Sequence, residues 1–298
     1  MLHYLFALAP FFVCLFWSFL LFGSSDKNTH TKKVLGIFML ALALLYFTIV
    51  VYYLGDVLSY RYVDDLYVLS SLLIFPLYYF FMVNLTKESI CKCKYVWHLI
   101  PALFFFVLYG VVSMQLSNED YEAYVVNFLH VKSPNPLLLS NNGMLLAFIF
   151  LLVRAYYLFQ IFRYVYLSFK LSKLWKERIS ESLSETIGRD IRMAEVLSVY
   201  ALSFATIGYL FDTFGQYFVS AQSIVLLLPG VFLAFLYFKL GLIGYEQNFT
   251  IYDLEEVEKN AELISDKIDE AYPSKISKRL ETLMDKKKLF LTPDLRIS

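Results

Sequence analysis

The chain has 298 residues, of which 59% are hydrophobic, 19% aromatic and only 17% charged. A soluble domain is about 45–50% apolar and about 25% charged, so this composition excludes an ordinary soluble globular enzyme. The formal net charge is zero, so no global basic field draws the chain onto nucleic acid or anionic lipid. The three cysteines, Cys14, Cys91 and Cys93, form neither a CxxC pair nor a disulfide framework.

Seven apolar stretches are long enough to cross a bilayer, whose hydrocarbon core of about 30 Å needs about 20 helical residues. No lysine or arginine precedes the first stretch, so we interpret it as a retained helix rather than a cleaved signal peptide. The sequence therefore predicts an all-α polytopic membrane protein, with a seven-helix domain over residues 1–244. The predicted spans run over 4–23, 34–54, 66–85, 96–115, 143–169, 194–219 and 222–244.

The loops between these spans differ sharply in charge. The first, third and fifth loops hold twelve lysines and arginines, whereas the second and fourth hold only Arg61 and Lys132. The second loop carries Asp56, Asp64 and Asp65 instead. Basic residues stay on the cytoplasmic side of a membrane. The alternation therefore predicts an outside amino terminus and an inside carboxyl terminus for a multi-pass protein of the cytoplasmic, or inner, membrane.

Two ionisable residues lie deep within predicted spans. Arg154 falls about eleven residues into the fifth span, and Asp212 lies about seven residues from the outer end of the sixth. A charge at membrane depth is costly, so such residues mark functional sites or tethering pairs. We therefore take Arg154 and Asp212 as candidates either for an intramembrane ion pair or for the lining of a pocket that binds a charged ligand.

The longest predicted outer loop contains an amphipathic segment near residues 117–132. Ser117 followed three residues later by Asp120 is typical of a helix start. Tyr121, Tyr124 and Phe128 then recur at helical spacing and share one apolar face. We expect a short helix across the outer surface, which either covers the bundle or acts as a lid over a ligand pocket.

Beyond residue 244 the chain changes from apolar to charged. Apolar residues at spacings of three and four form a heptad seam over 245–272, which predicts a cytoplasmic helix. The pattern fits a homodimer through this helix and fits equally well an amphipathic helix packed on its own domain. The seam consists of Leu254, Val257, Ala261, Ile264, Ile268 and Ala271.

Residues 273–298 predict a second, linker helix, because Pro273 breaks the first helix and Ser274 can cap the next. From Tyr245 to Ser298 the tail holds nine basic and twelve acidic residues. A free DNA-binding arm would be basic, so we expect no direct nucleic-acid binding by this chain.

The end of the tail resembles a known family. The run Leu-Glu-Thr-Leu-Met over 280–284, followed by Asp-Lys-Lys-Lys-Leu-Phe-Leu-Thr-Pro-Asp-Leu-Arg-Ile-Ser, resembles the lead-in to the DNA-binding domain of AraC-type transcription regulators. It looks most like the subgroup in which a polytopic membrane domain precedes that module. In the family, the Pro-Asp-Leu step, here Pro293 to Leu295, opens a paired helix-turn-helix unit. Since the sequence stops at Ser298, the resemblance implies a fragment or truncated form of such a regulator.

The leading hypothesis is a membrane-embedded sensory domain that relays the presence of a small ligand, or the state of the membrane, through its tail to a DNA-binding module. The alternative is a membrane transporter or channel, although the sequence contains no evident inverted repeat. No HExxH, GxSxG or Walker motif occurs and the four histidines are scattered. We therefore predict no enzyme activity, no catalytic residues, no metal and no cofactor.

Overall fold

The computed structural model describes residues 5–24, 29–86, 97–129, 139–181, 200, 203 and 224–246. The chain divides into two compact units, Met1–Asn248 and Phe249–Ser298, and every described residue belongs to the first. In this part of the chain all regular elements are helical, which confirms the predicted all-α class. They are α1 (Leu5–Gly23), α2 (Thr29–Leu54), α3 (Val57–Arg61), α4 (Asp64–Thr86), α6 (Ile100–Gln115), α7 (Asn118–Tyr124), the π-helical turn η1 (Val125–Leu129), α8 (Asn141–Glu181) and α10 (Ile224–Glu246).

Four of the described helices are long and apolar enough to cross a membrane, and their spanning parts are Phe6–Gly23, His30–Leu54, Asp64–Asn84 and Asn141–Lys173. They correspond to the first, second, third and fifth predicted spans. The fourth prediction coincides with α6, a shorter apolar helix of 16 residues, and the seventh with α10. The sixth predicted span, apart from residues 200 and 203, and the tail after Glu246 lie outside the described residues.

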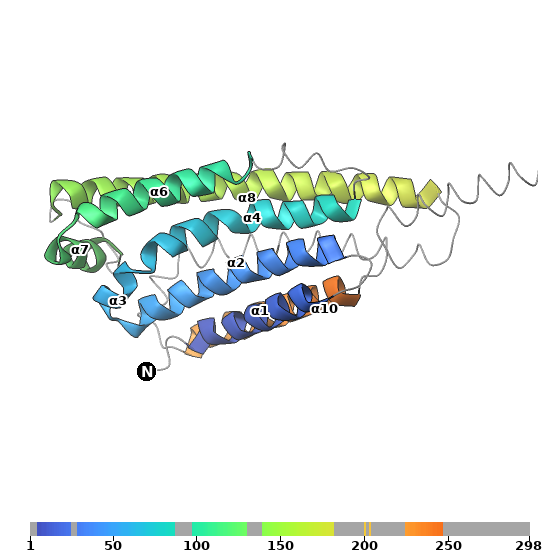
Figure 1. The fold of residues 1–298 in the computed structure, drawn as a ribbon, viewed down its shortest axis with the longest axis horizontal. Coiled ribbons are helices and arrows are strands. Elements are labelled where there is room, and N and C mark those ends of the chain that lie inside the picture. Colours follow the sequence, from blue (N-terminus) through green and yellow to red (C-terminus); the bar gives the residue numbers. More distant parts are fainter. Residues whose placement is uncertain are drawn as a thin grey trace, which may run out of the picture. The chain divides into compact units, whose positions relative to one another are not determined.

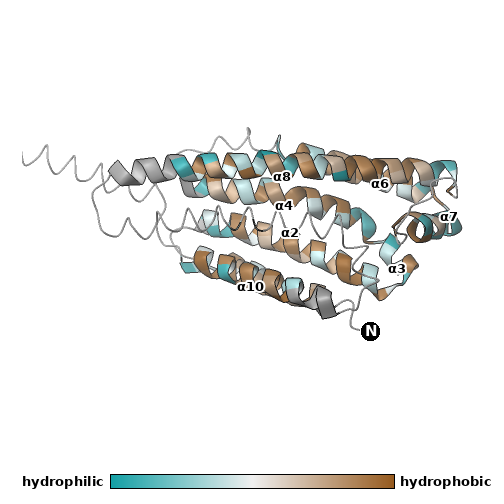
Figure 2. Ribbon diagram, turned by 180° about the vertical axis from the view of Figure 1, so that it is seen from behind, coloured by the Kyte–Doolittle hydropathy of each residue, from teal (hydrophilic) through white to brown (hydrophobic). Residues whose placement is uncertain are grey.

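Large apolar side chains are exposed along one face of several helices. On α1, Phe12, Phe16 and Phe19 are 60%, 53% and 71% exposed and recur at helical spacing. Met114 on α6 and Phe162 on α8 are 79% and 74% exposed. Figure 2 shows apolar residues along the length of α2, α6 and α10. A water-soluble monomer rarely exposes such continuous apolar surface, so these faces are compatible with insertion into lipid.

The helices pack in a defined order of neighbours. α1 packs against both α2 and α10, α2 packs against α4, and α4 packs against both α6 and α8 (Figure 1). Glycine allows close contacts between α10 and α1: a Cβ at Gly230 of α10 would clash with the backbone oxygen of Phe6, and one at Gly241 would clash with the Trp17 ring. Small residues commonly permit such close approach between membrane helices.

Two apolar cores hold the unit together. One joins α1, α2, α10 and the carboxyl-terminal halves of α4 and α8, and the other joins the amino-terminal halves of α4 and α8 with α3, α6, α7 and η1.

Some helices are longer than the predicted spans, because they continue into segments with charged residues. α8 has 41 residues, and α2 includes Lys32, which is only 2% exposed and places Nζ 5.1 Å from the Tyr245 ring centre.

Candidate ligand-binding site

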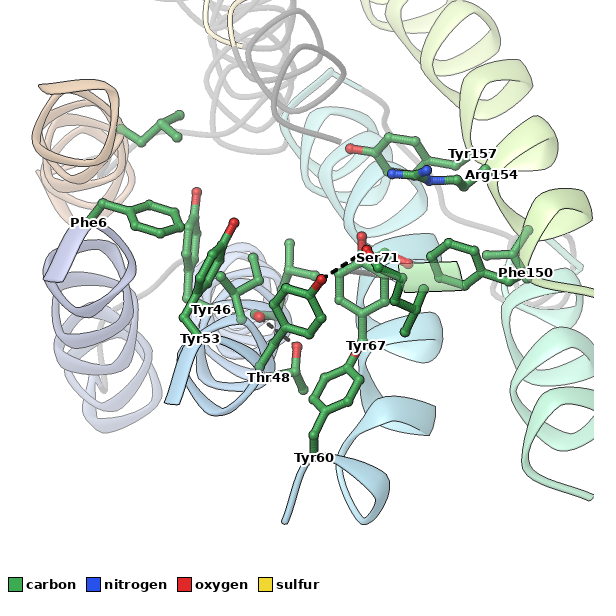
Figure 3. Close-up of a pocket in the computed structure, with 16 residues that line it drawn as sticks. Phe6, Tyr46, Thr48, Tyr53, Tyr60, Tyr67, Ser71, Phe150, Arg154 and Tyr157 are labelled. Carbon is green, nitrogen blue, oxygen red and sulfur yellow. Dashed lines mark hydrogen bonds between the residues drawn. The ribbon is translucent and has the colours of Figure 1, made fainter. Parts of the chain in front are cut away.

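A cavity of about 180 Å³ lies between α1, α2, α4, α8 and α10, next to α3 and η1. Eight of the sixteen described residues that line it are aromatic, and Arg154 is the single charged residue among them. Figure 3 shows these side chains converging from separate helices on a common space. The lining residues are Phe6, Leu45, Tyr46, Thr48, Ile49, Tyr52, Tyr53, Tyr60, Tyr67, Ser71, Leu129, Phe150, Val153, Arg154, Tyr157 and Leu233.

Arg154 lies on α8, and its guanidinium carbon is 5.2 Å from the centre of the Phe150 ring. In Figure 3 the guanidinium lies beside Tyr157 and Phe150 at the wall of the cavity. A guanidinium over an aromatic face gains a cation–π attraction. Of the two ionisable candidates, Arg154 thus lines a pocket, whereas Asp212 lies outside the described residues and the predicted pair stays untested.

Most hydroxyl groups around the cavity are already hydrogen-bonded within the protein. Each of these bonds orients a polar side chain that would otherwise be costly to bury. The hydroxyls of Thr48, Ser71 and Tyr52 donate to the carbonyl oxygens of Leu45 (2.7 Å), Val68 (3.0 Å) and Leu129 (3.2 Å), and the hydroxyls of Tyr46 and Tyr237 lie 3.1 Å apart.

Tyr60 connects the cavity to a buried carboxylate. Its ring lines the cavity, and its hydroxyl donates to Asp64 at 2.8 Å. Asp64 is fully buried and also accepts from Tyr109 (2.5 Å) and Tyr121 (2.8 Å), while the Tyr109 and Tyr124 hydroxyls lie 3.1 Å apart. Asp64 lies in the first turn of α4, where the helix dipole favours negative charge. Three hydroxyl donors and a helix amino terminus together stabilise a buried acceptor-only side chain.

The tyrosines of this network on α3 and α7 are neutral donors. Burial raises the pKa of the Tyr60, Tyr121 and Tyr124 hydroxyls above the ordinary value of 10, and the nearby Asp64 charge raises it further. Deprotonating any of them would place a second negative charge beside a buried carboxylate. These three hydroxyls therefore stay protonated, and remain able to donate, across the physiological pH range.

The predicted outer segment forms α7 and η1. The Ser117 side chain accepts a hydrogen bond from the Asp120 amide at 3.0 Å, which confirms the predicted helix start. The predicted apolar face is buried: Tyr121 and Tyr124 are fully buried and Phe128 is 8% exposed. The π-helical turn then brings Leu129 to the cavity wall. Movement of this segment as a lid stays a prediction.

Arg61 attaches α3 to the beginning of α7. One guanidinium nitrogen donates to Asn118 at 2.5 Å, and the other donates to the carbonyl oxygens of Ser113 (3.1 Å) and Leu116 (2.7 Å). The same guanidinium lies 5.3 Å from the Tyr121 ring centre. Because the two carbonyls belong to the end of α6, a cation here satisfies groups that the helix cannot bond internally.

Sequence reasoning counted Asp64 and Arg61 only as loop charges and did not single out Tyr60. The available signal was local: Tyr60 and Asp64 are only four residues apart in the sequence, Tyr60 near the end of α3 and Asp64 at the start of α4. The predicted seam residues 254–271 lie outside the described part of the chain. Within the described ranges, no group of three or more His, Cys, Asp or Glu side chains is placed to hold a metal ion.

The fold and this cavity define an all-helical protein with several helices compatible with membrane insertion and an aromatic, arginine-containing pocket between them. Comparison of the chain with protein-family models, curated proteins and solved structures finds no significant match.

Proposed function

We propose that this chain is the sensory domain of a membrane-bound transcription regulator. In this proposal it crosses the inner membrane seven times, with its amino terminus outside, and binds a small ligand in the cavity beside Arg154. The predicted cytoplasmic helices over 245–298 relay the bound state to a DNA-binding module of the kind that follows such a tail in AraC-type regulators. The cavity at the junction of separate helices is the observation that carries the ligand-sensing part.

The connection between cavity and outer segment supports a sensing role. Tyr60 lines the cavity and bonds to Asp64, which also holds Tyr121 of α7. Tyr52 lines the cavity and donates to Leu129 at the end of η1. A ligand that moves either tyrosine therefore acts directly on the packing of α7 and η1.

A ligand shifts a conformational equilibrium only to the extent that it binds one state more tightly than the other. The state with α7 and η1 closed over the end of the bundle keeps Tyr60 and Tyr52 at the cavity wall. A ligand that contacts these rings binds this state preferentially. The ligand therefore stabilises one arrangement of α2, α4 and α8. The tail transmits this change to the DNA-binding module.

A fusion experiment tests this function. An AraC-type DNA-binding module is joined after Ser298, and transcription from its target promoter is measured with the full chain, with residues 1–244 deleted, and with Arg154→Gln. We expect output to depend on the membrane domain and the arginine variant to alter it. Equal output with and without residues 1–244 would contradict the proposal.

Reporter fusions test the proposed topology separately. A reporter active only outside the membrane is inserted after Leu54 or after Leu85, in the second and third predicted loops. We expect activity only at the first position, because the second predicted loop lies outside and the third inside. The opposite pattern would invert the orientation.

The alternative function is transport. A charged residue on a spanning helix that lines a cavity is also typical of a substrate pathway, and Arg154 fits that description. Uptake of radiolabelled organic anions into proteoliposomes discriminates between the two functions. Uptake that is concentrative and abolished by Arg154→Gln would favour a transporter, whereas binding without uptake favours a sensor.

A further inference from the structure

We infer that the cavity between α2, α4 and α8 binds a neutral aromatic molecule with a single ring. This inference deepens the proposed function and rests on the same site. It follows from the apolar composition of the described wall, from the hydrogen bonds that the wall hydroxyls make within the protein, and from the size of the cavity.

The wall of the cavity is predominantly apolar. Thirteen of its sixteen described residues are aromatic or aliphatic. Apolar ligand surface is bound by such a wall in proportion to the area removed from water. An ionised ligand would lose its hydration at the same wall, which is strongly unfavourable unless protein groups replace the lost water. The aliphatic residues come from α2, η1, α8 and α10 and are Leu45, Ile49, Leu129, Val153 and Leu233.

The polar groups of the wall do not replace that water. Four wall hydroxyls donate their protons to acceptors within the protein, so they present only lone pairs to the cavity, and lone pairs do not solvate an anion. No carboxylate occurs among the sixteen described lining residues, so a cation would gain no ion-pair partner. The four hydroxyls belong to Thr48, Ser71, Tyr52 and Tyr60.

Arg154 is compatible with a neutral ligand. Its guanidinium lies over the Phe150 ring, 5.2 Å from the ring centre, and so forms part of the wall through that contact. A neutral ring requires nothing from its charge. The preference for a neutral ligand therefore comes from the other residues of the wall.

The walls and the volume select the shape of the ligand. In Figure 3, Tyr46 and Tyr53 of α2 lie on one side of the cavity, and Tyr67 of α4 and Phe150 of α8 lie on the other. Aromatic walls favour a flat ring through offset and edge-to-face contacts. A cavity of about 150 Å³ accommodates benzene, so the 180 Å³ here has room for one ring with a short substituent.

Thermal unfolding of the purified full chain in lipid nanodiscs tests the inference. The probes are toluene, its saturated analogue methylcyclohexane, the anion benzoate and the cation benzylammonium. A ligand that binds only the folded state raises Tm in a saturable way. We expect toluene to bind about 2- to 10-fold tighter than methylcyclohexane at equal concentrations in the lipid, because only the aromatic ring makes the preferred ring contacts. Both ions should bind about 10-fold or more weakly than toluene.

Cavity-filling variants separate the cavity from the surrounding lipid. Val153→Phe adds a ring at the wall and should weaken toluene binding by about 10-fold or more, because it occupies the space that the ligand needs. Val107→Phe is the matched control, since Val107 lies on α6, is 58% exposed and does not line the cavity. It should leave toluene binding unchanged.

A second pair of variants repeats the comparison on other helices. Leu45→Phe fills the cavity from α2, and Leu103→Phe makes the same change on the exposed surface of α6. Cooperative melting without any probe shows that each variant is folded. Toluene partitions equally into the lipid of every sample, so a difference between paired variants reports binding by the protein.

Four results would overturn the inference: no saturable rise in Tm for a wild type that melts cooperatively, a toluene effect that survives both filling variants, equal binding of toluene and methylcyclohexane, or tighter binding of either ion. The promoter fusion separates these failures from failure of the proposed function. If output requires residues 1–244 while no neutral ring binds, the ligand class is wrong and the sensory role stands. If toluene binds while output is independent of residues 1–244, the sensory role fails and the ligand class stands.

Discussion

The Tyr121 hydroxyl donates a 2.8 Å hydrogen bond to the Asp64 carboxylate, across 57 residues of sequence. This bond ties α7 to the first turn of α4. Because Tyr60 donates to the same carboxylate from the cavity wall, Asp64 is the point at which the cavity and the outer segment meet.

Asp64→Asn should destabilise the protein by about 3 kcal/mol, because bonds from tyrosine hydroxyls to a charged acceptor become bonds to a neutral amide with a single acceptor oxygen. Thermal unfolding in detergent measures the loss as a lower Tm. Asp56→Asn is the matched control. Asp56 is an exposed helix cap that accepts from the Leu58 amide at 3.2 Å, and Asn is an equally good cap. Equal Tm losses for the two variants would contradict the role assigned to Asp64.

Arg61→Lys should loosen α7 by about 1–2 kcal/mol, because an ammonium group cannot reach the three acceptors that the guanidinium fork contacts. Hydrogen exchange of the amides in Asn118–Tyr124 should accelerate about 5- to 30-fold. Arg163→Lys makes the same chemical change on α8, where the guanidinium lies over the Tyr164 ring, and should leave exchange in α7 unchanged. Acceleration by both variants would indicate a general loss of stability.

Gly230→Ala should destabilise the packing of α10 on α1 by about 1–3 kcal/mol, because the added Cβ would clash with the backbone oxygen of Phe6, and a backbone atom cannot rotate away as a side chain can. Gly23→Ala is the control, since a Cβ there meets nothing within 4 Å and alanine favours helix. We expect a lower Tm for the first variant and an unchanged or higher Tm for the second. An unchanged Tm for Gly230→Ala would contradict the close approach.

The capping of α7 should depend on pH through Asp120. Hydrogen bonds from the Ser117 and Ser140 hydroxyls lower the pKa of Asp120 below its ordinary value of 3.8. A depressed folded-state pKa contributes stability that is present above the ordinary value and is lost as pH falls through the folded-state value. Tm measured between about pH 6 and pH 3 should therefore fall less steeply for Ser117→Ala than for the wild type. Parallel curves would show that Ser117 does not influence Asp120.

Part of this architecture could be predicted from local sequence. The cap at Ser117 and the burial of Tyr121, Tyr124 and Phe128 follow from helical spacing, since a short helix with one apolar face buries that face. The burial of Asp64 was not predicted, because an acidic residue just before an apolar span is ordinarily an exposed loop residue. Its burial depends on Tyr109 and Tyr121, which arrive from other helices.

The sequence by itself determined the all-helical class and the apolar helices, because the length and continuity of apolar runs suffice to identify segments that lipid can surround. Only the tertiary structure decided which side chains form the site. The chain holds 24 tyrosines and 29 phenylalanines, too many for aromatic character alone to identify the residues of a site. Which of them surround Arg154, and which bond to Asp64, depends on the pairing of helix faces, and that pairing arises from packing between segments far apart in the chain.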